Sequence, residues 1–172
     1  MESTKGILFL GSQITTGGAQ RVLLDQAGWF HAQGYRVQVL FYYDKDGCLS
    51  EWQQRYPFPI DTLTAYKPGA GLRNLLGLMP GLLKLDKCIR EFKPDAIECF
   101  THDANLVGIP ISWLCGVPVR IATHHGRFAS LSGLRGKLHA RLINSSLTTK
   151  IVCVSGRAKN QALAEGIHED KI

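Results

Sequence analysis

Six short apolar runs, each rich in Val, Ile, Leu or Phe, alternate with amphipathic segments along the whole chain. Unbroken apolar runs of this length are typical of parallel strands that are covered on both faces. The strand candidates are Ile7–Leu10, Val37–Phe41, Ile60–Leu63, Ala96–Cys99, Val119–Thr123 and Ile151–Val154. Because strands and helices alternate, we predict a Rossmann-like α/β fold, with a doubly wound, mostly parallel sheet and helices on both faces.

The segments between these runs have helical periodicity. Residues 19–33 carry apolar side chains on one face and are followed by Gly34, a residue that commonly ends helices. Further helices are predicted over residues 72–92, 103–115, 134–146 and 155–165. Pro80 is expected to break or kink the first of these.

Size and composition indicate one globular domain over residues 1–172. Apolar residues make up 45% of the chain, which is enough for a packed core. No apolar run approaches the roughly 18 residues of a membrane span, and the polar residues 1–5 do not resemble a signal peptide. The five cysteines are widely spaced, which favours buried thiols in a reducing, cytoplasmic compartment over disulfides or a zinc site.

The formal net charge of +6 favours anionic partners such as nucleotide phosphates or phospholipid headgroups. Nucleic acid is a third anionic partner, but the sequence argues against it. No run of more than two basic residues occurs, and aromatic and basic residues are not interleaved. We therefore expect no nucleic-acid partner.

Gly17 and Gly18 lie where the first helix is expected to begin, after an apolar run that we expect to end at Gly11. Free backbone N–H groups and the positive end of the helix dipole suit this position to a phosphate. The spacing is not that of the G-x-G-x-x-G dinucleotide fingerprint, and no acidic residue directly ends the second strand at Phe41. The alternative is that the two glycines only form a turn.

Polar residues gather after the predicted strands, at the edge where doubly wound sheets bind ligands. His102 and Asp103 follow the fourth strand, whereas His124 and His125 follow the fifth. A metal site is disfavoured, because adjacent strand residues point to opposite faces and no metal-binding His spacing occurs. A serine hydrolase is also disfavoured, because Ser155 lacks the G-x-S-x-G context and is better explained as a helix cap.

Several segments together resemble the N-terminal, acceptor-side domain of family-4 retaining glycosyltransferases, which have the two-domain GT-B fold. These segments are residues 17–25 (GGAQRVLLD), 31–39 (HAQGYRVQV), 93–97 (KPDAI), 122–126 (ATHHG) and 151–155 (IVCVS), and His102 matches as well. Each segment is weak alone, but five in the family's order are specific. Gln20 departs from the glutamate that is frequent in the family's glycine loop.

The resemblance implies a function and a set of site residues. Gly17 and Gly18 would approach the diphosphate of a UDP- or GDP-type sugar donor. His125 would lie at the donor sugar near the reaction centre and count as the catalytic residue. His102 and Asp103 would face the acceptor, a glycan or lipid-linked molecule of polysaccharide biosynthesis. The family implies no metal or other cofactor, and no side-chain nucleophile is named.

The family also implies a second, donor-binding domain, whose motifs do not occur in residues 1–172. We therefore expect this chain to be one half of a hexosyltransferase and to be inactive alone. The alternatives are half of a GT-B-like sugar epimerase or phosphorylase, and a non-enzymatic flavodoxin-like binding module. A response regulator is disfavoured, because no acidic cluster follows the first strand.

Residues 131–143 form a basic, amphipathic stretch with two interpretations. Its leucines would either pack an ordinary helix on the sheet or, with the flanking Arg135, Lys137 and Arg141, contact anionic lipid. The second interpretation would place the protein peripherally at the inner face of the membrane, as a lipid-linked acceptor requires.

Overall fold

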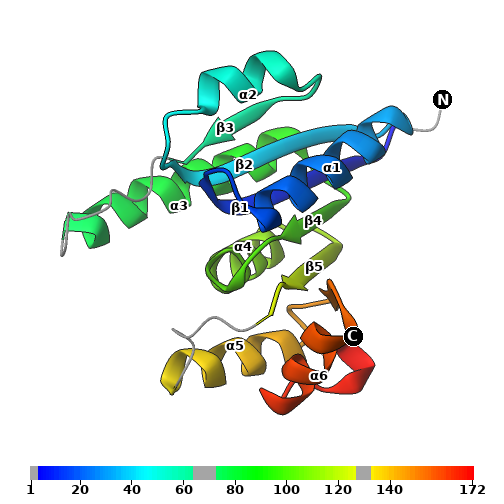
Figure 1. Cartoon of the computed structure of the whole chain (residues 1–172). Helices are drawn as coiled ribbons and strands as arrows, with labels where there is room; N and C mark the ends of the chain where they lie inside the picture. The colour runs from blue at the N-terminus through cyan, green and yellow to red at the C-terminus, as the bar shows by residue number, and fades with distance from the viewer. Residues whose placement is uncertain (1–3, 64–72, 127–132) are drawn as a thin grey trace.

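A computed structural model describes residues 4–63, 73–126 and 133–172, and in these ranges six strands form one sheet in the order β3-β2-β1-β4-β5-β6 (Figure 1). Every neighbouring pair of strands is parallel. The strands are β1 (Gly6–Ile14), β2 (Arg36–Asp44), β3 (Ile60–Thr62), β4 (Ala96–Cys99), β5 (Val119–His124) and β6 (Lys150–Cys153). This order is that of a doubly wound Rossmann-like sheet, as predicted.

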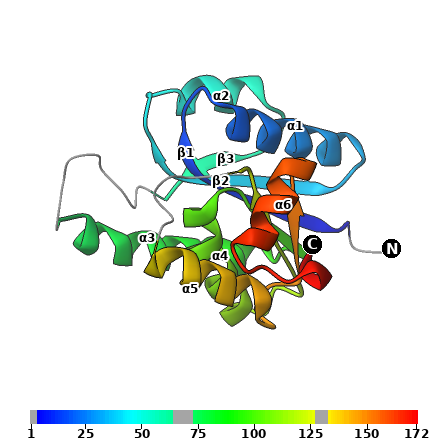
Figure 2. The ribbon, with the colours of Figure 1, turned by 60° about the horizontal axis from the view of Figure 1, so that its bottom comes forward.

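Helices cover both faces of the sheet (Figure 2). They are α1 (Gly18–Ala32), α2 (Leu49–Arg55), α3 (Arg73–Phe92), α4 (His102–Leu114), α5 (Leu134–Asn144) and α6 (Gly156–Ala164), followed by the short 3-10 helix η2 (Glu169–Lys171). None of the helices in the described ranges is long and apolar enough to cross a membrane.

The alternation of side chains along each strand divides the core into two layers. On one face, Phe9 and Phe41 pack with Leu23 of α1. On the other face, Leu8 and Ile97 pack with residues of α3 and α4. Because both faces are covered, the central strands are largely apolar, with Glu98 of β4 as a buried exception.

The first strand is longer than predicted, because β1 continues through Gly11 to Ile14 and pairs with a β2 that reaches Asp44. The expectation that the first strand ends at Gly11 is wrong. Gly11 is a packing residue in the strand, since a Cβ atom there would lie 2.4 Å from the ring of Phe41. The glycine accommodates the phenylalanine and does not signal a turn.

The expected break at Pro80 does not occur, and one further helix was not predicted. Pro80 does not end α3, which runs from Arg73 to Phe92, because one missing N–H donor is offset by the burial of Leu85 and Ile89. Helix α2 was not predicted, since it is only 7 residues long and too short to show a helical period in the sequence. The carboxylate of Asp44 holds its start by accepting the backbone N–H groups of Gly47, Cys48 and Leu49.

Candidate functional site

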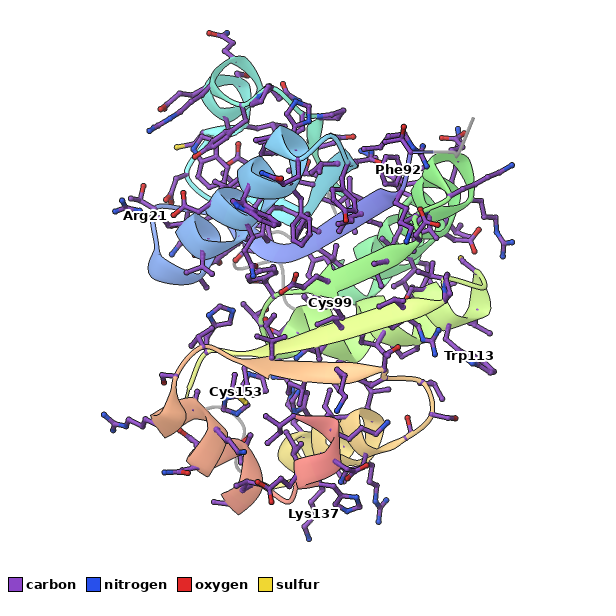
Figure 3. All side chains as sticks on the ribbon, turned by 90° about the vertical axis from the view of Figure 1, so that its right-hand side faces the viewer. Arg21, Phe92, Cys99, Trp113, Lys137 and Cys153 are labelled. Carbon is purple, nitrogen blue, oxygen red and sulfur yellow. The ribbon has the colours of Figure 1, made fainter. Side chains whose placement is uncertain are left out.

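The strand order reverses between β1 and β4, which places the carboxyl ends of β1, β4 and β5 side by side. In Figure 3 this edge lies on the left, where Arg21 of α1 and Cys153 of β6 are labelled. Neighbouring strands are about 4.8 Å apart, so β1 and β5, which flank β4, are separated by roughly 10 Å across the sheet. Open α/β sheets bind ligands at such a reversal. Thr101 follows β4 here with a φ of 84°, a strained conformation that is concentrated at functional sites.

The N-terminus of α1 is open, as the phosphate interpretation requires. Gly17 is its N-cap residue in an extended conformation, no side chain caps the helix, and its first turn holds no acidic residue. A Cβ atom on Gly18 would have no described heavy atom within 4 Å outside its own helix. The exposed backbone N–H groups of this turn can therefore approach an anion closely.

His125 is half-buried and is held from two sides. Its ring packs against Phe100 with the centroids 5.4 Å apart. Its Nε2 atom lies 3.1 Å from Oγ1 of Thr123, which itself donates to the carbonyl oxygen of Cys99 at 3.0 Å. Burial, with a contribution from His124, lowers the pKa of His125, so the ring is neutral at pH 7.

His124 points to the opposite face of the sheet, as strand alternation predicts. There it joins His102 of α4, whose ring centroid is 5.1 Å away, and His139 of α5 contacts His102 at 4.5 Å. All three rings are buried. Burial and neighbouring histidines lower the pKa of His102 to about 3 and the pKa of His139 to about 4, so both are neutral.

Asn105 ties this histidine cluster to β5. Its Nδ2 atom donates to the carbonyl oxygen of Thr123 and lies 3.1 Å from Nε2 of His139, which must accept because amide nitrogens only donate. His102 is only 4% exposed. Its ring packs between His124 of β5 and His139 of α5, whereas the neighbouring Asp103 is exposed.

His102, His124 and Glu165 each place one potential metal-ligating atom within 4.8 Å of the others. The hydrogen bonds nevertheless oppose a metal at His124. Its Nδ1 atom accepts the backbone N–H of Gly126 at 3.2 Å, which leaves Nε2, 3.0 Å from the Glu165 carboxylate, to carry a ring proton. A protonated Nε2 donates to Glu165 and has no lone pair for a metal. The arrangement is better described as a link between β5 and α6.

Asp103 occupies the rim of the edge. Its carboxylate pairs with Arg135 of α5 at 2.9 Å, and its backbone carbonyl accepts the hydroxyl of Tyr42 at the same distance. This polar cluster joins the ends of β2, α4 and α5 next to the site. The Asp103 side chain is exposed, so it remains accessible to a ligand, and an exposed pair of this kind contributes little stability.

Four residues near the site were not predicted from the sequence: Asn105, Thr123, His139 and Glu165. Thr123 lies within the ATHHG segment, and its place two residues before His125 on the same face was a usable signal. His139 and Glu165 come from distant helices and carry no local signal. Only the folded topology brings them to His124.

The chain belongs to Glycosyltransferase Family 4, which it matches over residues 16–172. No curated protein sequence matches it significantly. Solved structures provide the comparison of folds.

Anabaena HepE in complex with UDP aligns with a TM-score of 0.73 and 19% identity over 96% of this chain and 42% of HepE. The lipopolysaccharide outer core galactosyltransferase WaaB aligns with a TM-score of 0.71 and 16% identity over 97% of this chain and 44% of WaaB. UDP-GlcNAc 2-epimerase from Neisseria meningitidis aligns with a TM-score of 0.64 and 15% identity over 96% of this chain and 44% of the enzyme. The chain thus spans less than half the length of these proteins and has the fold of one half of a GT-B glycosyltransferase.

Proposed function

We propose that this chain is the N-terminal, acceptor-side half of a hexosyltransferase that moves a sugar, with retention, from a UDP- or GDP-type donor to a glycan or lipid-linked acceptor. The observation that carries the proposal is the convergence of an uncapped helix N-terminus at Gly17 and Gly18 with the half-buried His125 at one reversal of strand order. The family match and the UDP and UDP-glucose complexes of HepE support it.

Each part of the edge has a chemical task in this reaction. The leaving diphosphate gains negative charge in the transition state, and the N–H groups of the first turn of α1 would stabilise that charge. His125 would contact the donor sugar beside the reacting carbon. Asp103 would face the acceptor. His102, which is buried beside His124, would hold this end of α4 in place on the acceptor side. No residue is assigned as a nucleophile.

A second domain would complete the donor site. HepE, WaaB and the epimerase are each more than twice the length of the segment that matches this chain. In the proposed enzyme, closure of the two domains would bring the donor to the acceptor and exclude water. Residues 1–172 alone would therefore show no transferase activity.

Helix α5 supports a lipid-linked acceptor. His139, Ala140 and Ile143 are buried against the fold, whereas Leu134 and Leu138 are exposed beside basic residues. Only the C-terminal part of the expected apolar stripe packs on the sheet, and residues 131 and 132 lie outside the described ranges. An exposed, basic and apolar helix face fits an anionic membrane surface, which would place the enzyme peripherally at the cytoplasmic membrane face.

The decisive experiment measures sugar transfer by the two-domain protein with His125→Ala, and uses His124→Ala and His168→Ala as controls. We expect His125→Ala to lower kcat/KM by a factor that corresponds to the loss of about 1–3 kcal/mol of transition-state binding. The Tm should change little. His124→Ala should lower Tm and leave turnover per folded molecule near normal, because His124 is fully buried and bonded to Glu165. The exposed His168 should be silent.

Swapped phenotypes of His124 and His125 would mean that the wrong face of β5 has been assigned to the site. Full activity of both variants would remove β5 from the site. Conversion of the nucleotide sugar without any acceptor would identify an epimerase instead of a transferase.

A further inference from the structure

The hydroxyl group of Thr123 is placed to decide which nitrogen of His125 carries the proton. The side chain of Thr123 is 1% exposed, and its one hydroxyl proton is directed to the Cys99 carbonyl oxygen, which can only accept. The same Oγ1 atom lies 3.1 Å from Nε2 of His125. With its proton already committed, Oγ1 is the acceptor of that second contact, and Nε2 of His125 is therefore the protonated nitrogen.

The other ring nitrogen is then an acceptor. In a neutral imidazole with the proton on Nε2, the Nδ1 atom keeps its lone pair. Phe100 packs against the ring and restricts its rotation, so Nδ1 has a fixed direction. No hydrogen bond to this atom is formed within residues 4–63, 73–126 and 133–172. A neutral Nδ1 repels a phosphate oxygen but accepts a hydrogen bond from a hydroxyl.

We propose that Thr123 is a positioning residue that holds His125 as the Nε2–H tautomer, so that Nδ1 accepts a hydrogen bond from a hydroxyl group of the bound sugar. The tautomer depends on the structure alone, whereas the sugar contact rests on the proposed function. Thr123 itself touches no ligand and acts only through His125. In this proposal the N-terminus of α1 binds the diphosphate, whereas His125 binds the sugar.

The tautomer is tested in the 172-residue chain by long-range ¹H–¹⁵N correlation spectra of the histidine rings at pH 7.5, with His125→Ala used for assignment. In the unmodified chain we expect Nε2 of His125 to be protonated and Nδ1 to be bare. Thr123→Val should shift both nitrogens of His125 toward an average of the two tautomers. Thr123→Ser keeps the hydroxyl and should restore the original spectrum.

Thr148→Val is the matched control, because Thr148 is equally buried and its hydroxyl also donates to a backbone carbonyl, that of Leu142. It should lower stability without changing the His125 signals. Unchanged His124 signals in Thr123→Val confirm that the fold is kept. A proton on Nδ1 of His125 in the unmodified chain, or the same tautomer in Thr123→Val, would overturn the assignment.

The sugar contact is tested separately by transfer kinetics of the two-domain protein. Thr123→Val should lower kcat/KM about tenfold, and Thr123→Ser should retain most of it. Normal turnover of a Thr123→Val protein whose spectra show the lost tautomer would overturn the sugar contact of His125 and leave the tautomer control by Thr123 in place.

Discussion

At the scale of single residues, the edge of the sheet separates neighbours in sequence into different environments. His124 and His125 are adjacent, yet one is fully buried among α4, α5 and α6 and the other is half-exposed beside Phe100. The separation follows from the period of two along a strand. This facing was predictable from the sequence, whereas the partners of each ring were not.

Gly18 provides a sharp test of the proposed phosphate site. We expect Gly18→Val in the two-domain protein to lower turnover strongly without loss of stability, because the new side chain would occupy the open space above the first turn of α1. The measurements are kcat/KM and Tm. Gly28→Val is the control, since Gly28 lies on the same helix and a Cβ there also meets no described atom within 4 Å outside that helix. Equal activity of the two variants would leave Gly17 and Gly18 as a turn only.

The buried histidines predict how stability depends on pH. The pKa of His102 is lowered to about 3 and that of His139 to about 4, from 6.5 in an exposed histidine. The unfolded chain therefore binds more protons than the folded chain below pH 6.5, and stability falls as pH falls. Between pH 7.5 and pH 5 the loss is about 2 kcal/mol for each histidine.

Glu98 acts in the opposite direction. Burial raises its pKa to about 7, so its contribution to stability is largest in acid and is lost as pH rises through 7. We expect the free energy of unfolding of Glu98→Gln to drop by about 4 kcal/mol from pH 7.5 to pH 5, and that of the unmodified protein to drop less. Denaturant titrations at both pH values measure this difference. Parallel pH dependence of the two proteins would show that Glu98 is ionised in the fold.

At the scale of elements, the sequence predicted the strands better than their ends. All six apolar runs are strands, because burial on both faces selects for continuous apolar sequence. The end of β1 was misjudged at Gly11, since the ring that needs this glycine, Phe41, comes from the neighbouring strand. Helix α2 escaped prediction because its start depends on the side chain of Asp44 at the end of β2. The first error comes from a partner that is distant in sequence, whereas Asp44 lies only 3–5 residues before the N–H groups that it accepts.

Helix α5 yields a prediction for membrane contact. The double variant Leu134→Ser and Leu138→Ser should lose binding to anionic phospholipid vesicles at unchanged Tm, because both side chains are exposed, at 72% and 47%. Vesicle sedimentation measures the bound fraction. Binding of the unmodified protein should weaken in high salt, since Arg135, Lys137 and Arg141 attract the headgroups through screened charges.

The control for this helix is the double variant Val22→Ser and Leu163→Ser, which removes partly exposed apolar side chains from α1 and α6. Its vesicle binding should equal that of the unmodified protein. Equal loss in both double variants would mean that the apolar character of the whole surface, and not α5, governs binding.

At the scale of the whole molecule, the order of strands brings the residues of the candidate site together. Segments about 100 residues apart, such as β1 and β5, come close together because the chain builds β2 and β3 on one side of β1 and then β4, β5 and β6 on the other. The sequence predicted a doubly wound sheet and the edge at which polar residues gather, but not the order of the strands. The supports from α5 and α6 could not be predicted, because their positions depend on helix packing and not on any local pattern.

The half-site also predicts how weakly the chain binds nucleotides alone. In the proposed half-site, the part of the chain that the structure describes offers a diphosphate the N–H groups at the start of α1, and association costs several kcal/mol of lost translational and rotational freedom. We expect calorimetry of this chain with UDP or GDP to detect no binding in the micromolar range. Micromolar binding would contradict the half-site. If Gly18→Val then abolished that binding, the phosphate site at α1 would be complete without a second domain, and the proposed division of the donor site between two domains would be wrong.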